Sequence, residues 1–247
     1  MIRSIHILLI MLAGIFAGIV YRDAGLFWWA CAIAMYFVFG CLGVVVTFHR
    51  YLSHRSFQFR WWWLERLFIL FGHLAGSGSA IGWVAVHKAH HAYSDTDRDP
   101  HGPRRGWRNF VPDYDDVVNY RMVRSMLRDR YLRWLHKNGI LLIAAYYLAL
   151  WLIGGDIAVA FFGGIPQAIT ILMSVITNWV GHVYGYQTYE TGEDSRNCWW
   201  LAIPAWGESW HNNHHAKPGR ASFSHKWWEI DISGAVIALI SKQGTMK

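Results

Sequence analysis

Nine of the 14 histidines in this chain fall into four short stretches, and two of these stretches have the spacing HxxHH. On a helix, positions i, i+3 and i+4 share one face, with Cβ atoms about 5–6 Å apart, so each triplet can direct three imidazoles at a common volume. Neutral ring nitrogens are good ligands for zinc, copper, iron and nickel. The spacing therefore predicts a metal site. The nine residues are His49, His54, His87, His90, His91, His182, His211, His214 and His215.

The number of histidines indicates more than one metal ion. A structural zinc site closes its shell with four ligands, whereas nine histidines could hold two metals with four or five nitrogens each and open positions left over. Such a shell favours iron and oxygen chemistry, although the spacing alone leaves copper possible. The isolated histidines are interpreted as surface or snorkelling residues and not as ligands. These are His6, His73, His101, His136 and His225.

Four apolar segments must position the histidines, at residues 5–20, 26–48, 140–153 and 157–180. A membrane-spanning helix needs roughly 20 apolar residues, with a range of about 17–25, so the first and third segments need help from their flanks. The turns within the two pairs are short, YRDAG and GGD, and we expect two hairpins that cross the membrane and return. The first segment is interpreted as a retained span and not as a signal peptide. A further stretch, residues 61–78, contains charges and three tryptophans, and we expect it to lie in the interface.

The distribution of basic residues predicts the orientation. Residues 49–138 and 181–247 fall on the same side of the membrane as the N-terminus, and 15 of the 23 Lys and Arg residues lie between Arg50 and Lys137. Because basic residues mark the cytoplasmic side, we expect both termini and all the histidine stretches to be cytoplasmic. The formal charge of +7 is then a signal of topology and not of nucleic-acid binding. The chain, residues 1–247, is predicted to be a single all-α integral membrane domain.

At these motifs the chain resembles the membrane fatty acid desaturases, most closely their Δ9, stearoyl-CoA-type branch. The similar stretches are HRYLSHRSF, HKAHHAYSDTDRDPHGPRRGW, NWVGHVYGYQTYETGEDSRN and GESWHNNHHAKPGRA, in the family's order over about residues 40–230. The resemblance implies four transmembrane helices, a cytoplasmic helical cap and two iron ions held by the nine histidines. It also implies that Asn178 approaches one iron through water, and that Trp83 and Trp206 line an acyl tunnel.

The implied reaction is the O2-dependent insertion of a cis double bond, at Δ9, into a saturated acyl chain carried on CoA or on a lipid. The metal ligands would carry the chemistry, without separate acid–base residues. Each ligand histidine should donate its other ring N–H to an acceptor. The candidate acceptors are Asp95, Asp97, Asp99, Glu208 and Asn212, any one of which could equally be a solvated loop residue. Arg104 and Arg105 could bind a phosphorylated headgroup or carrier, or could equally be ordinary basic residues of the cytoplasmic side.

Partners and competing functions also follow from the sequence. No His-Pro-Gly-Gly haem motif occurs, so we expect a separate electron donor, either a ferredoxin, which is favoured, or a cytochrome b5-type protein. After HGPRRGW the chain continues as RNFVPDYDD, which departs from the family pattern and indicates a different loop over the site or the headgroup. One alternative is an alkyl or acyl hydroxylase with the same metal centre. Another is a non-enzymatic membrane metal-binding protein, which is disfavoured because the histidines lie beyond the span ends and not near mid-membrane.

Overall fold

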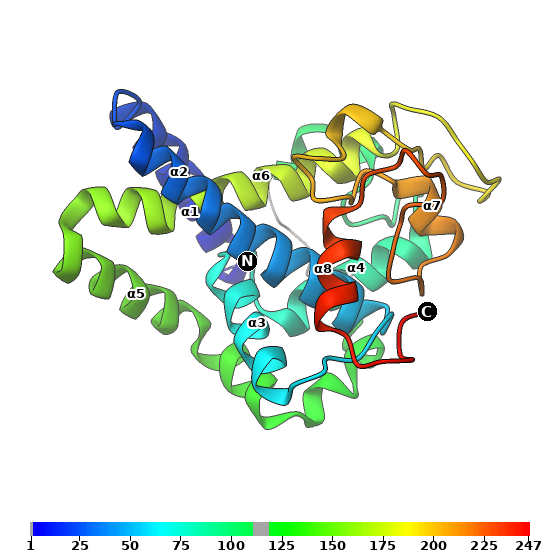
Figure 1. Ribbon diagram of the computed structural model, residues 1–247, viewed down its shortest axis with the longest axis horizontal. Helices are drawn as coiled ribbons and strands as arrows, with labels where there is room; N and C mark the ends of the chain where they lie inside the picture. The colour runs from blue at the N-terminus through cyan, green and yellow to red at the C-terminus, as the bar shows by residue number, and fades with distance from the viewer. Residues whose placement is uncertain (1, 111–118) are drawn as a thin grey trace.

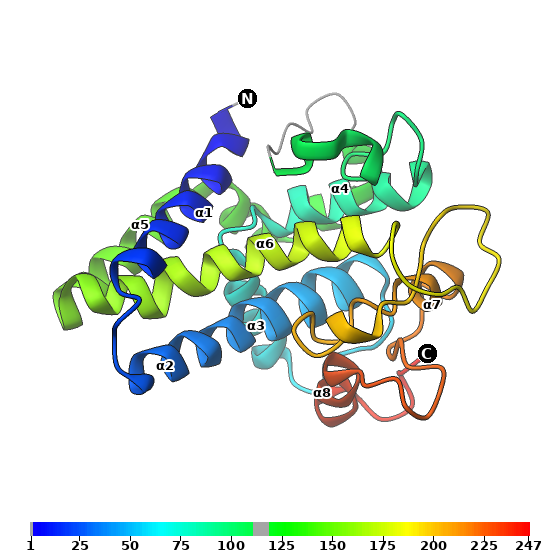
Figure 2. The same cartoon turned by 90° about the horizontal axis from the view of Figure 1, so that it is seen from above.

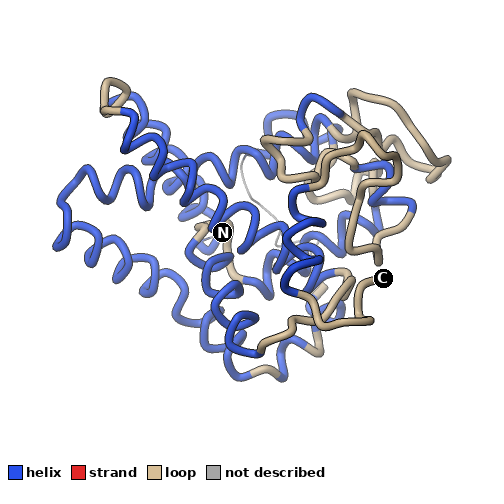
Figure 3. The backbone as a smooth tube through the Cα atoms, viewed as in Figure 1, coloured by secondary structure: helices blue, strands red, loops and turns tan. Residues whose placement is uncertain are grey.

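The computed structural model of this chain describes residues 2–110 and 119–247. Within these two ranges the secondary structure is helical, with three isolated β-bridges and no strand (Figure 3). The expectation of an all-α protein is therefore confirmed. Residues 111–118 of the predicted cytoplasmic segment 49–138, and with them most of the stretch RNFVPDYDD, lie outside the described residues.

Two helical hairpins project from one side of the molecule (Figures 1 and 2). The first joins α1 (Ile2–Val20) to α2 (Leu26–Tyr36), and the second joins α5 (Arg130–Val159) to η5 (Ala160–Gly164) and α6 (Ile165–Val180). α5 is interrupted at Gly155, whose φ of 66° is a left-handed value that glycine adopts without steric cost. The chain reverses here, within the stretch GGD, so this glycine is the corner of the second hairpin.

Small residues and aromatic rings hold the two hairpins together. A Cβ added at Gly14 of α1 would lie 2.1 Å from the carbonyl oxygen of Gly164, so the two backbones are in contact. Phe161 of η5 is fully buried, and its ring packs against Trp28 at 5.7 Å and Trp29 at 5.2 Å between centroids. Close packing of small residues is the usual way in which helices associate in an apolar medium.

α2 continues directly into η1 (Phe37–Ser53), a helix with π-type, i→i+5 hydrogen bonding. At its end the Ser53 hydroxyl donates to the Phe48 carbonyl at 2.8 Å, and the His54 N–H donates to the His49 carbonyl at 3.2 Å. π-type turns are rare and occur frequently at functional sites. Because this geometry places residues five apart about one turn from each other, His49 and His54 face the same way.

α3 (Trp62–Leu74) packs across η1. The crossing depends on two glycines, because a Cβ at Gly43 would lie only 2.3 Å from the backbone nitrogen of Gly72. With 13 residues, α3 is too short to cross a bilayer. The three tryptophans at its start are exposed, as an interfacial helix requires: Trp61 by 41%, Trp62 by 77% and Trp63 by 51%. The depth of α3 in a membrane stays a prediction.

The remaining helices form the half of the molecule opposite the hairpin tips (Figure 1). α4 (Ala80–Tyr93) begins at Ser79, whose hydroxyl accepts a hydrogen bond from the Gly82 N–H at 3.2 Å. The chain then returns to α5 through three short 3-10 helices, and the C-terminal part adds a fourth 3-10 turn and two helices. These elements are η2 (Pro103–Phe110), η3 (Tyr120–Val123), η4 (Met126–Arg128), η6 (Trp199–Leu201), α7 (His211–Ala216) and α8 (Ile232–Ile240).

Among the described residues, two helical stretches are long and apolar enough to cross a membrane, Leu26–Ser53 and Arg130–Val180, and Ile5–Val20 is a shorter apolar helix. The second stretch contains both arms of the hairpin bent at Gly155. Its most apolar window is almost entirely unburied, with Leu152 and Ile153 69 and 86% exposed. An apolar surface of this extent requires an apolar environment. The structure thus supports membrane association through at least two helices.

Candidate metal centre

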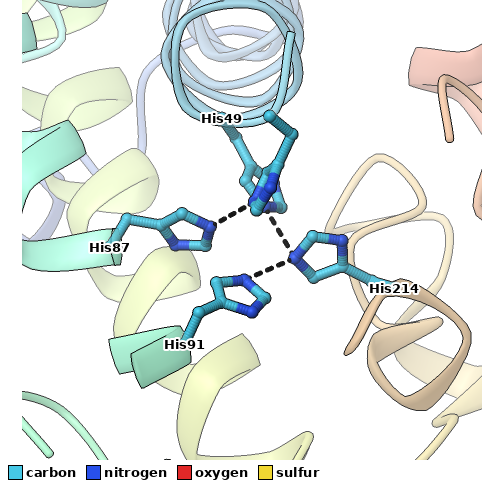
Figure 4. A group of neighbouring side chains, drawn as sticks. His49, His87, His91 and His214 are labelled. Carbon is cyan, nitrogen blue, oxygen red and sulfur yellow. Dashed lines mark hydrogen bonds between the residues drawn. The ribbon is translucent and has the colours of Figure 1, made fainter. Parts of the chain in front are cut away.

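The nine histidines lie together in two neighbouring groups, in the half of the molecule away from the hairpin tips. In each group, one ring nitrogen of every member lies within 4.8 Å of the corresponding nitrogens of the others. Figure 4 shows four rings of the larger group, from η1, α4 and α7, turned toward one another. The five-histidine group consists of His49, His54, His87, His91 and His214, and the four-histidine group of His90, His182, His211 and His215.

In the five-histidine group, the facing nitrogens are as far apart as two ligands of one ion. His214 Nε2 lies 3.0 Å from His49 Nε2 and 2.9 Å from His91 Nε2. His54 Nε2 and His87 Nε2 are 2.7 Å apart. With metal–imidazole bonds of about 2.0–2.1 Å, two ligands at right angles are separated by roughly 3 Å. The group therefore has the spacing of a coordination shell.

Carboxylates determine which nitrogen of several rings faces inward. Asp99 accepts a hydrogen bond from His90 Nδ1 at 2.9 Å, and Asp95 accepts one from His182 Nδ1 at 2.9 Å. A neutral imidazole that donates from Nδ1 has its lone pair on Nε2. His90 and His182, two members of the four-histidine group, therefore each direct the Nε2 lone pair at the centre of the group. Metal-binding histidines that a carboxylate orients have the same arrangement.

The ring nitrogens that face the two centres fit a metal ion better than they fit one another. His90 Nε2 and His215 Nε2 are buried and have no hydrogen-bond partner, although buried polar atoms are normally paired. In the other group His49 directs Nδ1 at Glu208, so its Nε2 lone pair faces His214. Converging lone pairs repel unless a cation lies between them. Both groups can therefore bind a metal, and a shell of imidazoles alone suits a first-row transition metal.

The surroundings keep these histidines neutral. Burial, together with the positive charge that His91 and Lys88 would add, lowers the pKa of His54 to about 2. Burial likewise lowers the pKa of His90 to about 3 and holds the pKa values of His87 and His211 well below their ordinary range. A metal would therefore displace few protons, since the ligands are already in the form that binds it.

Each HxxHH triplet contributes to both groups, which differs from the expectation that a triplet shares one volume. His87 and His91 of α4 belong to the five-histidine group, and His90 between them belongs to the other. α7 divides in the opposite sense, with His214 in the first group and His211 and His215 in the second. Adjacent residues of an α-helix point about 100° apart. The histidines at positions i and i+4 of a triplet can therefore belong to one group while the histidine at i+3 belongs to the other.

Behind His49, the candidate acceptor Glu208 belongs to a buried ion network with Arg50 and Asp231 that the sequence did not predict. Glu208 contacts His49 Nδ1 with one carboxylate oxygen, and its other oxygen accepts hydrogen bonds from Arg50 at 2.9 and 3.1 Å. Arg50 is fully buried, and it also donates to Asp231 at 2.7 Å and to the Ala221 carbonyl at 2.9 Å. Burial raises the pKa of Glu208 to about 7, against the lowering effect of Arg50. For Arg50, the only sequence signal was its position as a basic residue directly after His49.

The other candidate acceptors separate into distinct roles. Asp97, between the two acids that contact histidines, is 95% exposed and lies 3.6 Å from Arg104. Asn212 accepts the backbone N–H groups of Thr188 and Tyr189 at 2.7 and 2.8 Å, so it fixes a loop and does not contact a ligand ring. Glu193, which the sequence did not single out, lies 3.5 Å from His215 Nδ1.

A cavity of about 360 Å³ reaches the histidine groups from within the helical part of the molecule, and both predicted tunnel tryptophans line it. The Trp83 ring stacks on His87, with centroids 5.1 Å apart, and the Trp206 ring packs at 4.9 Å on Tyr36. Asn178 also lines the cavity. The assignment of Asn178 as a water-mediated ligand stays a prediction.

Three further residues of the second motif differ from the sequence interpretation or stay untested. His101, which we set aside as an isolated histidine, stacks on His90 with centroids 4.4 Å apart and lines the cavity. Its position directly after DRDP, next to the second histidine motif, is the sequence feature that could have indicated that His101 lies near the metal groups. Arg104 and Arg105 are not among the described residues that line the cavity, and their assignment to a headgroup or carrier stays a prediction.

Comparison with known proteins agrees with this geometry. The profile of the family described as fatty acid desaturase matches residues 26–230. The sn-1 stearoyl-lipid 9-desaturase of Anabaena variabilis is 36% identical over 230 residues, which cover 88% of this chain and 83% of that protein. The protein of the same description from Synechocystis sp. is 34% identical, over 87% and 70% of the two chains. The Delta-9 acyl-lipid desaturase 2 of Arabidopsis thaliana is 35% identical, over 82% and 68%.

Proposed function

This chain belongs to the fatty acid desaturase family, and from that premise we propose that it inserts a cis Δ9 double bond into a saturated acyl chain. It is an oxidoreductase that acts on acyl chains. The net reaction takes one O2, two electrons and two protons, removes two vicinal hydrogens from the chain, and releases two water molecules. The relatives named for stearoyl-lipid and acyl-lipid 9-desaturation support both the position of the double bond and an acyl group held in a lipid ester.

One observation carries the proposal: two buried groups of neutral histidines lie at a cavity with tryptophan walls. An unactivated methylene has no acidic proton, so acid–base side chains alone cannot remove its hydrogens. Iron bound by the five- and four-histidine groups would supply the oxygen-activating chemistry that this step needs. The imidazole shells leave the metal identity open to other first-row ions, and family membership favours iron.

The residues of this chain would then do the positioning. Three carboxylates contact the Nδ1 atoms of ligand histidines and so keep the Nε2 atoms of these rings turned toward the metal groups. They are Asp95, Asp99 and Glu208. Trp83 lies against His87 and would place the reacting carbons beside the metal groups while excluding water. Trp206, whose φ of 59° is unusual for a tryptophan, lines the same cavity. A rigid channel of this kind selects one pair of carbons by holding them close to the reacting centre.

The same proposal includes a membrane topology and partners. We propose four spans, because α1, α2 with η1, and the two arms bent at Gly155 all run between the hairpin tips and the histidine half (Figures 1 and 2). The positive-inside pattern supports a cytoplasmic position for the histidines and both termini. Electrons would come from a separate donor, a ferredoxin or a cytochrome b5-type protein, and the membrane lipids would surround the hairpins.

Expression in a desaturase-deficient host tests the function. We expect a new monounsaturated acyl chain with no added oxygen, and the position of its double bond is read by mass spectrometry of derivatised fatty acids. His87→Ala and His215→Ala, one from each histidine group, should abolish the product. His225→Ala is the matched control, because this half-buried histidine contacts the Tyr189 hydroxyl at 3.0 Å and neither histidine group. A hydroxylated product, or product formation that survives both ligand substitutions, would overturn the proposal.

A further inference from the structure

A second polar region lies in the same cavity, distinct from the metal groups. Its members come from α1, α3, the loop before α4, and α5, so no sequence motif joins them. They include three of the isolated histidines that the sequence analysis set aside. The residues are His6, His73, Ser77, Ser79 and His136, and all five line the cavity.

Packing brings these side chains to one place. The Ser79 hydroxyl and His136 Nδ1 share a hydrogen bond of 2.5 Å, which joins the loop to α5. A Cβ at Gly139 would lie 2.3 Å from His73 Nε2, so α5 lies directly against the His73 ring. On the other side Ile7 of α1 approaches Gly78, because a Cβ there would lie 3.6 Å from the Ile7 side chain. Four elements thus meet around one polar space.

Three polar atoms in this space have no hydrogen-bond partner. They are His73 Nδ1, Ser77 Oγ and His6 Nδ1, each with negligible solvent contact. His73 is only 2% exposed, and unpaired polar atoms are rare at such depth. Because these atoms line a cavity that continues to the histidine groups, they indicate a ligand that brings its own polar atoms.

The charge of the lining defines the chemistry of that ligand. Among the described residues that line the cavity there is no arginine, and Lys137 is the single lysine. Burial lowers the pKa of His73 to about 4, so the ring is neutral at physiological pH and offers one donor and one acceptor. The several phosphate charges of coenzyme A would need paired arginines or lysines, and such a pair, Arg121 and Arg124, lies with Tyr120 in a neighbouring pocket and not in this lining. An uncharged ester with its neighbouring glycerol oxygens fits the lining better.

We propose that the region formed by His6, His73, Ser77, Ser79 and His136 binds the ester-linked glycerol part of a membrane glycerolipid. The Ser77 hydroxyl and the His73 ring N–H donate to the ester carbonyl, and the acyl chain runs along the cavity to the histidine groups. The ligand would enter beside Tyr120 and Ile140, which line the cavity and are 47 and 58% exposed. This inference rests on the proposed desaturase function and assigns its substrate to the lipid esters.

An ester–ether comparison tests the hydrogen bonds directly. The full-length, iron-loaded protein in detergent is titrated with radiolabelled 1,2-distearoylglycerol and with its dioctadecyl ether analogue, which has the same chains without the carbonyl oxygens. We expect the wild-type protein to bind the ester roughly fivefold to tenfold more tightly, as loss of hydrogen bonds to a neutral acceptor predicts. Stearoyl-CoA should compete at least tenfold less well than the unlabelled ester.

Two variants and two controls complete the experiment. Ser77→Ala removes only the unpaired hydroxyl, and His73→Phe keeps the ring shape beside Gly139. In both, ester affinity should fall by several fold, and the ester-to-ether ratio should approach one, with the iron content unchanged. Ser125→Ala and His225→Phe, at residues outside the cavity lining, should keep the wild-type ratio.

The outcomes separate this inference from the proposed function, because binding is measured without turnover. A protein that forms the unsaturated product but shows an ester-to-ether ratio near one, or variants that keep the wild-type ratio, would overturn the glycerol-ester site alone. Displacement by stearoyl-CoA as effective as by the glyceride would do the same. A protein that binds the ester selectively but forms no double bond would instead refute the desaturase function.

Discussion

Replacement of Asp95 by asparagine removes one negative charge behind the four-histidine group and changes almost nothing else. Asp95 Oδ2 accepts from His182 Nδ1 at 2.9 Å and from the Asp194 N–H at 2.8 Å, and an amide oxygen can accept both bonds. The residue has a φ of 59°, which asparagine tolerates well. Burial would raise the pKa of Asp95, but the hydrogen bonds from His182 and Asp194 lower it below its ordinary value. The charge is therefore present at neutral pH.

The expected loss follows from what the carboxylate does for His182. An anionic acceptor makes the ring a better donor to a metal, and removal of such a partner costs roughly 10- to 100-fold in metal affinity. This corresponds to about 1.4–2.8 kcal/mol. Because Asp95 contacts only the four-histidine group, one of the two ions should become easier to remove. Asp97→Asn is the matched control, since Asp97 is 95% exposed and contacts no histidine.

The measurement is a chelator titration of the iron-loaded protein, with bound iron counted at each step. Wild type and Asp97→Asn should release iron over the same range. Asp95→Asn should release one ion at roughly 10- to 100-fold lower chelator strength and retain the other. If Asp95→Asn releases both ions over the same chelator range as Asp97→Asn, the Asp95 carboxylate does not strengthen metal binding by the four-histidine group.

Three more outcomes are expected. Gly43→Val should prevent α3 from packing on η1 and lower the melting temperature, because its Cβ would lie 2.3 Å from the Gly72 nitrogen. The control Gly18→Ala should leave the melting temperature within a few degrees of wild type, because nothing lies within 4 Å of a Cβ at Gly18. Gly40→Leu should shift the product toward shorter acyl chains, since a Cβ there would lie 2.7 Å from the Tyr36 ring in the cavity wall; product analysis by chain length measures this. The metal-free protein should lose stability as pH falls below about 6.5. Its buried histidines have folded-state pKa values below the unfolded value, so the unfolded state binds more protons, at about 1.4 kcal/mol per group and pH unit. Thermal melts at pH 8 and 5.5 check the sign.

The convergence of the histidines could be predicted from the sequence because helical spacing is local. HKAHH lies on α4 and HNNHH on α7, so the rings of each motif emerge from one short helix. How they divide between two centres could not be predicted. The division depends on the rotation of each helix about its own axis, and tertiary packing sets that rotation. His90 and His91 are adjacent in sequence and serve different groups.

The supporting residues were predictable only in part. Asp95 and Asp99 lie next to the second motif, and their closeness in sequence made them candidates. Nothing in the sequence joined Arg50 to Asp231, which is 181 positions later. The π-type geometry of η1 also has no local signature, although it places His49 and His54 on one face. The polar space around His73 was missed for the same reason, since its members are far apart in the chain.

The arrangement of charge shows how a shell of neutral imidazoles could hold the two proposed divalent ions inside a buried site. The imidazoles add no charge, so compensation must come from groups behind them. Five carboxylates and one guanidinium lie in contact with the ligand rings or with each other, which gives a charge of about four negative units when all are ionised. Two divalent cations would balance it. Without them the same carboxylates repel one another, so metal binding and folding of this half of the protein should be coupled. The groups are Asp95, Asp99, Glu193, Glu208, Asp231 and Arg50.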